Sequence, residues 1–252
     1  MADSTDREYD EDYYRYQIAP SLQSARIVLP HVWKYLQPQS VADVGCGRGA
    51  WLKAWHELGS SELIGLDGSW NTQSAMIDDA IRFHAVDLNK PFSLGRKVGL
   101  AMSVEVAEHL EPASSVVFID SLIDLSDAIV FGAAYIKQNG PTHINERQHS
   151  FWGRLFLERH YQPFDLFRPH IWSDTRIPFW YRQNTFLYVR EDSRAYATLK
   201  SAGLAEMSDP GFLDCVHPEL FALRSNSELG FMTHVKHLAP TFRKAIRRRW
   251  GF

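Results

Sequence analysis

The stretch that most constrains the fold is Val41-Ala-Asp-Val-Gly-Cys-Gly-Arg-Gly-Ala-Trp51, in which an apolar strand runs directly into three alternating glycines. Residues 40–44 are small or β-branched for the most part, as is typical of a buried parallel strand. Gly45, Gly47 and Gly49 allow a tight turn against which a ligand can lie. From Ala50 the apolar residues recur at helical spacing, so the loop leads into a helix N-terminus. This arrangement predicts a site for a nucleotide-type cofactor.

Acidic residues at the ends of successive expected strands narrow the class of cofactor fold. A dinucleotide-binding fold is expected to have a further G-x-x-G step, and Asp43 would be unusual in it. The strand expected at residues 62–67 ends in Asp67, and the strand expected at residues 81–87 ends in Asp87. The strand expected at residues 98–104 is followed by Glu105. One such acid is more often a helix cap or a solvated charge, but four in this order favour a ligand site.

An acid two positions before G-x-G-x-G, with the later strand-end acids, resembles the class I S-adenosylmethionine-dependent methyltransferases over about residues 40–190. The resemblance implies that Asp43 faces the methionine end of the cofactor and that Asp67 accepts hydrogen bonds from the ribose hydroxyls. It places Asp87 and Leu88 beside the adenine. The full cofactor-binding set expected from it is Asp43, Gly45, Cys46, Gly47, Gly49, Asp67, Gly68, Asp87, Leu88 and Ser103.

The remaining periodicities fit an α/β fold, a Rossmann-like seven-stranded class I methyltransferase sheet with helices on both faces. We expect a leading helix at residues 19–36 interrupted by Pro30, and helices at 112–125 and 148–159. A fifth strand is expected at 127–134, and an antiparallel last pair at about 163–167 and 184–190. The expected organisation is an N-terminal arm and leading helix (1–36), the methyltransferase domain (37–190) and a C-terminal helical extension with a basic tail (191–252).

Composition limits the class of protein. The 252 residues, 45% hydrophobic and 23% charged, suffice for one α/β domain with terminal extensions. The formal net charge is −3, so a nucleic-acid partner is not expected unless its surface is local. The absence of a long apolar run and the polar Met1-Ala-Asp-Ser start predict a cytoplasmic protein. Two cysteines predict neither a disulfide framework nor a cysteine zinc site, and Cys46 fits a small buried filler.

A second constellation follows the expected fourth strand. Glu105, Glu108 and His109 are spaced i, i+3 and i+4, so in a helical turn they would share one face. Carboxylates with one imidazole suit Mg²⁺ or Mn²⁺ better than zinc. The E-x-x-E-H step is similar to that of metal-dependent ubiquinone-biosynthesis O-methyltransferases and small-RNA 2′-O-methyltransferases. The alternative is a metal-free site, because many class I methyltransferases have E-x-x-x-H here merely to shape the pocket.

The segment Thr142-His-Ile-Asn-Glu-Arg147 follows the expected fifth strand at the mouth of the same crevice. His143 is therefore the expected partner, either as a fourth metal ligand or as the base that takes the acceptor's hydroxyl proton. His149 is the alternative ligand. The expected catalytic residues are His143, Glu105, His109 and Asn145, and the expected metal ligands are Glu105, Glu108, His109 and His143.

Residues 168–172 and 177–184 are dense in aromatic, Arg and amide side chains, which suit sugar rings and attached phosphates. With the His-Ile-Asn-Glu segment they resemble bacterial methyltransferases found with surface-polysaccharide biosynthesis. The alternative is that Trp172, Phe179 and Trp180 belong to the core.

The two termini raise further expectations. Tyr13, Tyr14 and Tyr16 are expected to form a lid over the cofactor pocket, or else belong to a frayed arm. The end of the chain, residues 241–252, is basic and amphipathic. It is expected either to be a solvated terminus or to bind an anionic surface such as the inner face of the membrane.

Together these patterns predict S-adenosylmethionine-dependent methylation of a hydroxyl, on a sugar in a glycan or glycolipid precursor. The alternatives are methylation of an RNA terminal ribose, methylation of a small molecule, and a non-catalytic scaffold in a glycan-assembly complex. The E-x-x-E-H resemblance favours the RNA alternative and the acidic net charge opposes it, since only the C-terminal tail offers a run of basic residues. The intact cofactor acids argue against the scaffold.

Overall fold

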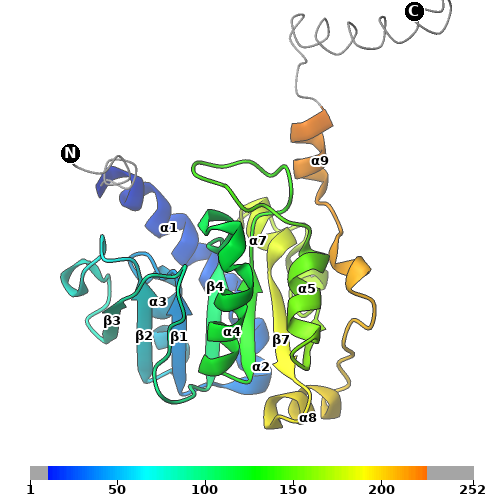
Figure 1. The fold of residues 1–252 in the computed structure, drawn as a ribbon, viewed down its shortest axis with the longest axis horizontal. Coiled ribbons are helices and arrows are strands. Elements are labelled where there is room, and N and C mark those ends of the chain that lie inside the picture. Colours follow the sequence, from blue (N-terminus) through cyan, green and yellow to red (C-terminus); the bar gives the residue numbers. More distant parts are fainter. Residues whose placement is uncertain (1–10, 226–252) are drawn as a thin grey trace, which may run out of the picture. The chain divides into compact units, whose positions relative to one another are not determined.

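The computed structural model describes residues 11–225, with the side chains of residues 18–225 (Figure 1). The basic tail and the side chains of Tyr13, Tyr14 and Tyr16 lie outside the described residues. The first compact unit ends at Cys215 and the second begins at Val216. Residues 191–215, which the sequence analysis placed in a C-terminal extension, lie in the first unit. Helix α9 (Pro218–Ser225) belongs to the second.

Within the described residues the first unit is built on one seven-stranded sheet, in the order β3-β2-β1-β4-β5-β7-β6. The strands β1 to β5 run parallel to one another, and β7 is antiparallel to both β5 and β6. The strands are β1 (Ser40–Val44), β2 (Glu62–Asp67), β3 (Ile81–Ala85), β4 (Leu100–Val104), β5 (Ala128–Gly132), β6 (Tyr161–Phe164) and β7 (Phe186–Arg190). The expected fold class is therefore confirmed.

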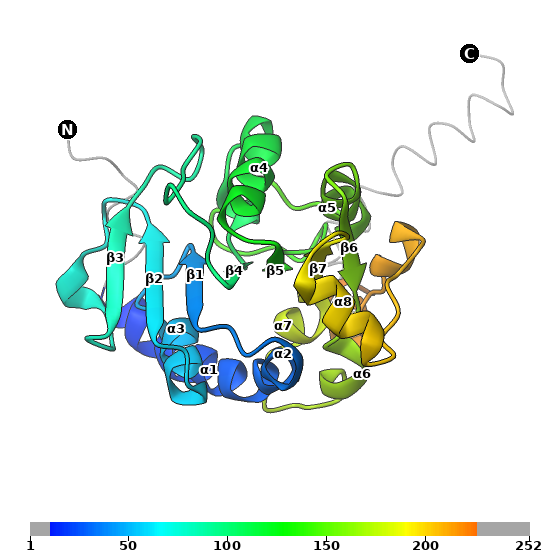
Figure 2. The ribbon, with the colours of Figure 1, turned by 90° about the horizontal axis from the view of Figure 1, so that it is seen from below.

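Helices cover both faces of the sheet, as Figure 2 shows edge on. One face carries α1 (Glu11–Val28), α2 (Pro30–Leu36), α3 (Ala50–Leu58), α6 (Arg168–Ile171), α7 (Phe179–Asn184) and α8 (Arg194–Ser201). The other carries α4 (Ser115–Leu125), α5 (His149–Leu157) and the 3₁₀ turn η5 (Pro210–Leu213). Further 3₁₀ turns are η2 (Gln73–Ala75), η3 (Ala107–His109) and η4 (Pro112–Ser114).

The alternation of side chains along β1 explains the two cores. Val41 packs among α1, α2 and α3, whereas Ala42 and Val44 pack on the opposite face against the cluster that includes α4. Both clusters are almost fully buried, as a sheet covered on both sides requires. The parallel register of β1 with β2 and β4 brings the carboxyl ends of these strands to one edge. Ligands bind at that edge in open α/β sheets.

Two details differ from the sequence expectation. The third and fifth strands are shorter than expected, because β3 ends at Ala85 and β5 ends at Gly132. The last two strands are not a simple hairpin, since α6 and α7 lie between β6 and β7. These helices have only four and six residues, and α7 is mostly buried, so they are too short to show the amphipathic stripe by which longer helices are recognised.

Candidate active site

The glycine loop has the conformation that its sequence predicts. Gly45, Gly47 and Gly49 all have positive φ angles, of 80°, 51° and 83°. A Cβ atom on Gly45 would lie 2.3 Å from Val106 Cγ2, so a side chain would force the loop away from the end of β4. Helix α3 begins directly after Gly49. The three glycines therefore serve both the backbone turn and its close packing.

Asp67 closes this loop onto the end of β2. Its carboxylate accepts hydrogen bonds from the backbone N–H of Gly47, at 2.8 Å, and of Gly68, at 2.7 Å. Burial raises the pKa of Asp67 to about 6, and the two N–H groups oppose that shift. A carboxylate has about four acceptor positions, so Asp67 retains capacity for two more donors.

Asn71 braces the same loop, and the sequence analysis missed it. Its side-chain amide donates to the Gly47 carbonyl, and its oxygen accepts from Arg48 at 3.1 Å. Asn71 is buried. It follows β2 in an irregular segment without periodicity, so its only sequence signal is a position four residues after Asp67.

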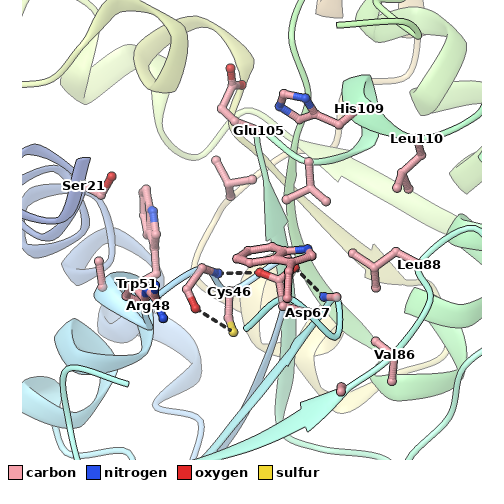
Figure 3. Close-up of a pocket in the computed structure, with 18 of the residues that line it drawn as sticks. Ser21, Cys46, Arg48, Trp51, Asp67, Val86, Leu88, Glu105, His109 and Leu110 are labelled. Atoms are coloured by element: carbon pink, nitrogen blue, oxygen red, sulfur yellow. Dashed lines mark hydrogen bonds between the residues drawn. The ribbon is translucent and has the colours of Figure 1, made fainter. Parts of the chain in front are cut away.

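The loop forms one side of a cavity of about 650 Å³ at the carboxyl edge of the sheet (Figure 3). Of the expected cofactor residues, Gly45, Cys46, Gly47, Asp67, Gly68, Asp87 and Leu88 line it. Glu105 and His109 line the same cavity. Residues that the sequence analysis did not place there include Ile18, Ser21, Trp51, Trp70, Val86 and Tyr181. Helix α1 thus contributes Ile18 and Ser21, in the neighbourhood where a lid was expected.

Three expected cofactor residues are not on the cavity wall. Gly49 begins α3, and Ser103 is fully buried in β4 with a hydroxyl that has no partner among the described residues. Asp43 lies buried behind the glycine loop, and one of its carboxylate oxygens has no partner among them either. Burial raises the pKa of Asp43 to about 8, with a further contribution from the charge of Asp67. Gly49, Ser103 and Asp43 therefore do not line the cavity, and their direct contact with a cofactor stays a prediction.

Cys46 is the small, buried packing residue that the sequence predicted. Burial raises the pKa of its thiol above the ordinary value, and the sulfur lies where a Cβ on Gly65 would come within 2.7 Å. A protonated, enclosed thiol is a weak nucleophile. Cys46 therefore packs the loop onto β2 while part of it borders the cavity.

Glu108, His109 and His143 come together beside the cavity. One ligand atom from each lies within 4.8 Å of the others. Neither oxygen of the buried Glu108 carboxylate makes a well-aligned hydrogen bond to the described residues, although the backbone N–H groups of Glu108 and Ala134 and the carboxyl group of Glu105 lie close enough to influence its pKa. Burial raises the pKa of Glu108 well above its ordinary value, and the charge of Glu105 adds to this shift. A buried carboxylate without a well-aligned donor and beside two imidazoles has the character of a metal-ligand set.

The two imidazoles are fixed through their Nδ1 atoms. His109 Nδ1 lies 2.9 Å from Thr142 Oγ1, and that hydroxyl donates to the Pro141 carbonyl at 2.7 Å. His143 Nδ1 lies 2.8 Å from the Glu146 carboxylate. Both Nδ1 atoms therefore carry protons, which leaves a lone pair on each Nε2. Burial, followed by the charge of His143, lowers the pKa of His109 to about 4.

Glu105 does not belong to this cluster, which corrects the expected four-ligand set. Its carboxylate oxygens accept hydrogen bonds from Asn184 Nδ2 at 2.8 Å and Gln138 Nε2 at 2.9 Å. The turn after β4 is not an α-helix, because Glu105 has a φ of 58° and only residues 107–109 form a 3₁₀ turn. The carboxyl groups of Glu105 and Glu108 therefore do not share a helical face.

Two further expectations are corrected. His149 is not a metal ligand, because it is buried in α5 with its ring nitrogens facing Leu213 O and Asn184 Oδ1. Asn145 is not at the reaction centre. Its amide nitrogen donates to Ala107 O and Ser115 Oγ, so it holds the His143 segment onto the turn after β4.

The aromatic region 168–184 is divided between core and cavity. Tyr181 lines the cavity and Trp180 is partly exposed, whereas Phe179 is buried. Arg168 is buried beneath η5, where it pairs with Asp165 and donates to Leu213 O. Arg168 is therefore structural rather than a ligand-binding cation.

Comparison with solved structures identifies the architecture. One chain of the complex between a Haloferax volcanii methyltransferase activator and a putative methyltransferase is 14% identical, with a TM-score of 0.53, over 75% of this chain and 98% of that one. The plantazolicin methyltransferase BpumL with SAH is 14% identical, with a TM-score of 0.52, over 75% and 91%. The fold is that of class I methyltransferases.

The methyltransferase domain of bacterial CtHen1-C is also similar, at 14% identity and a TM-score of 0.51, over 67% of this chain and 97% of that chain. No protein-family model and no curated protein matches the sequence. At these identities the likeness establishes the fold, and the chemistry has to be argued from the site itself.

Substitution of Asp43 by Asn should make the ligand-free protein relatively more stable at alkaline pH. The folded-state pKa of Asp43 is about 8, whereas an unfolded aspartate titrates near about 4. The wild type should therefore lose stability as pH rises from about 4 to about 8, at roughly 1.4 kcal/mol per pH unit from this group. Urea unfolding of both proteins across this range measures the difference. A difference that does not change with pH would contradict the burial of a titrating Asp43.

Proposed function

We propose that the protein is an S-adenosylmethionine-dependent O-methyltransferase whose acceptor is a hydroxyl of a sugar in a glycan or glycolipid precursor. The observation that carries the proposal is the continuity of one cavity. The same space is lined by the glycine loop and Asp67 and by Glu105 and His109. A cofactor on the first group would therefore lie next to an acceptor on the second.

The first group fits the cofactor on its chemistry. Asp67 is fixed at the end of β2 with remaining acceptor capacity, which suits two ribose hydroxyls. Val86, Leu88 and Leu110 supply an apolar surface suited to the adenine (Figure 3). When bound, S-adenosylmethionine would supply an electrophilic methyl group.

The second group fits a divalent cation. Glu108 has no well-aligned donor among the described residues, and His109 and His143 each present an Nε2 lone pair while Nδ1 is anchored. With Glu105 outside the cluster, the set is one carboxylate and two imidazoles. That set favours Mn²⁺ over Mg²⁺, because imidazole suits transition metals better than it suits Mg²⁺. A cation there would supply Lewis acidity toward the acceptor oxygen.

The chain's own residues orient the acceptor and take its proton. His109 lines the cavity, but its Nε2 lone pair is the one that would bind the cation, so the Glu105 carboxylate is the group left to take the proton. Glu105 presents a carboxylate that accepts a hydrogen bond from the acceptor. Helices α1, α3 and α7 contribute Ser21, Trp51 and Tyr181 to the wall of the same cavity, where they would help to orient the acceptor.

The cavity favours an uncharged sugar over an RNA terminus. Arg48 is the one Lys or Arg among the described residues that line it, and Arg48 is bonded to Asn71. The phosphates of an RNA acceptor need several cationic contacts. Trp51 and Tyr181 are instead aromatic surfaces suited to the apolar faces of a sugar ring.

Incubation with methyl-labelled cofactor and separated glycan, lipid and RNA fractions tests the proposed acceptor. Label should enter the glycan or glycolipid fraction and resist alkali, because a methyl ether survives treatment that cleaves a methyl ester. An Asp67→Ala variant is the matched control and should leave every fraction unlabelled at the same cofactor concentration. Label found in RNA alone would contradict the sugar acceptor and support the ribose alternative.

Replacement of Glu108 by Gln should separate metal binding from cofactor binding. Calorimetry should give Mn²⁺ affinity at least about tenfold weaker in Glu108→Gln, because one charged ligand is lost, with S-adenosylhomocysteine affinity unchanged. Glu105→Gln is the control, since Glu105 lies outside the cluster, and it should keep Mn²⁺ affinity. Equal losses in the two variants would contradict the cluster, and no Mn²⁺ binding by the wild type would remove the metal from the proposal.

A further inference from the structure

A chain of buried side chains links helix α5 to the cavity wall. His149, Asn184 and Gln138 come from α5, from the end of α7 and from the segment after β5. All three are buried, and the chain ends at the carboxylate of Glu105, which lines the cavity. Buried polar groups of this kind need complete and mutually consistent hydrogen bonding. This requirement determines which atom of each side chain donates and which accepts.

A backbone N–H sets the direction at one end. The Tyr135 N–H can only donate, and it lies 3.2 Å from Gln138 Oε1. The amide oxygen of Gln138 therefore faces Tyr135, and its nitrogen faces Glu105 Oε2 at 2.9 Å. The orientation of the Gln138 amide is thus fixed by the backbone.

The next amide follows from the first. Gln138 Oε1 also lies 3.0 Å from Asn184, so it must face the Asn184 nitrogen. That nitrogen donates to Glu105 Oε1 at 2.8 Å as well. The Asn184 oxygen is consequently turned toward His149 Nε2 at 3.0 Å, where it can only accept.

The proton on His149 is therefore required at Nε2. The other ring nitrogen, Nδ1, lies 3.1 Å from the Leu213 carbonyl, and both lone pairs of that carbonyl are already in use, since it accepts from Arg168 at 3.0 Å and from the Cys215 N–H at 2.9 Å. Burial lowers the pKa of His149 to about 4, so the ring is neutral near pH 7 and has one proton. The Asn184 oxygen also accepts a hydrogen bond from Gln183 Nε2 at 2.8 Å, and an unprotonated His149 Nε2 would place a second acceptor 3.0 Å from it, which the Nε2–H form avoids.

We propose that His149 is a positioning residue for Glu105, acting through Asn184. Its Nε2–H, with the side-chain amide of Gln183, holds the Asn184 amide in the orientation that donates to Glu105, and Gln138 donates to the second carboxylate oxygen. The left-handed backbone of Glu105 and its N–H bond to Gly132 O fix the other end of the side chain. Glu105 is thereby presented to the cavity in one orientation, with acceptor capacity left for a hydroxyl donor.

The first test reads the His149 ring directly and does not depend on the proposed function. Nitrogen-15 NMR of the imidazoles in the full-length protein near pH 7 distinguishes the two tautomers, and the signal missing in His149→Gln assigns the residue. The proposal predicts a proton on Nε2 and an unprotonated Nδ1. A proton on Nδ1 alone would overturn it.

The second test uses matched variants of the same residue. In His149→Gln the amide nitrogen reaches the position of Nε2 and can still donate to Asn184, whereas in His149→Asn it reaches only the position of Nδ1. With the proposed methyl-transfer assay, His149→Gln should keep kcat within about threefold. His149→Asn should lose about tenfold or more, as expected for one buried hydrogen bond of about 1.4 kcal/mol, with unchanged S-adenosylhomocysteine affinity.

A purely structural role predicts a different result, in which both variants lose kcat in proportion to their loss of thermal stability. That outcome would overturn the proposal. Asn184→Asp provides a second isosteric variant, because it replaces the donor to Glu105 by an acceptor, and it should lose kcat as His149→Asn does. Retention of full kcat in Asn184→Asp would also overturn it. If no fraction accepts a methyl group, the proposed function fails while the NMR measurement still decides the tautomer.

Discussion

The interaction on which the rest of the site depends is the bonding of Asp67 to the backbone N–H groups of Gly47 and Gly68. It joins the ends of β1 and β2, so the glycine loop is held open toward the cavity instead of collapsing onto the sheet. Asn71 adds a second bond to the same glycine, from its side-chain amide to the Gly47 carbonyl. The cost is a partly desolvated carboxylate, whose pKa is raised to about 6 by burial. A ligand hydroxyl that donates to Asp67 would relieve part of that cost.

In the second half of the cavity, too, buried carboxylates need compensating partners, and Glu105 and Glu108 differ in what supplies them. Glu105 is surrounded by amide donors, so its carboxylate is satisfied within the protein. Glu108, three residues later, is more deeply buried and has no well-aligned donor among the residues described. A buried carboxylate needs a compensating partner. A cation bound by Glu108 together with the imidazoles of His109 and His143 would supply it. Glu105 would therefore bind the acceptor, whereas Glu108 would bind a cation.

The sequence allowed the fold to be predicted because its signals are local. The bounds of β1 and β2, the glycine loop and most helices follow from periodicity and from glycine, as Ser40–Val44 and Glu62–Asp67 illustrate. The predicted metal ligands included all three members of the cluster, Glu108, His109 and His143, but they also included Glu105, whose positive φ breaks the helical turn on which that prediction depended. Asn184, Gln138 and Asn71 were missed, since polar residues brought together from distant segments have no periodic signal. Tertiary packing alone decides that His149 faces Asn184 and not a metal.

The central claim is that the cavity at the carboxyl edge of the sheet binds S-adenosylmethionine through Asp67. Calorimetric titration of the full-length protein with S-adenosylhomocysteine, beside an Asp67→Ala variant of comparable folding, tests it most directly. The account predicts one site in the wild type and affinity weaker by about tenfold or more in the variant, as expected for the loss of hydrogen bonds to a charged group. Absence of binding to the wild type, or equal affinity in the two proteins, would contradict it.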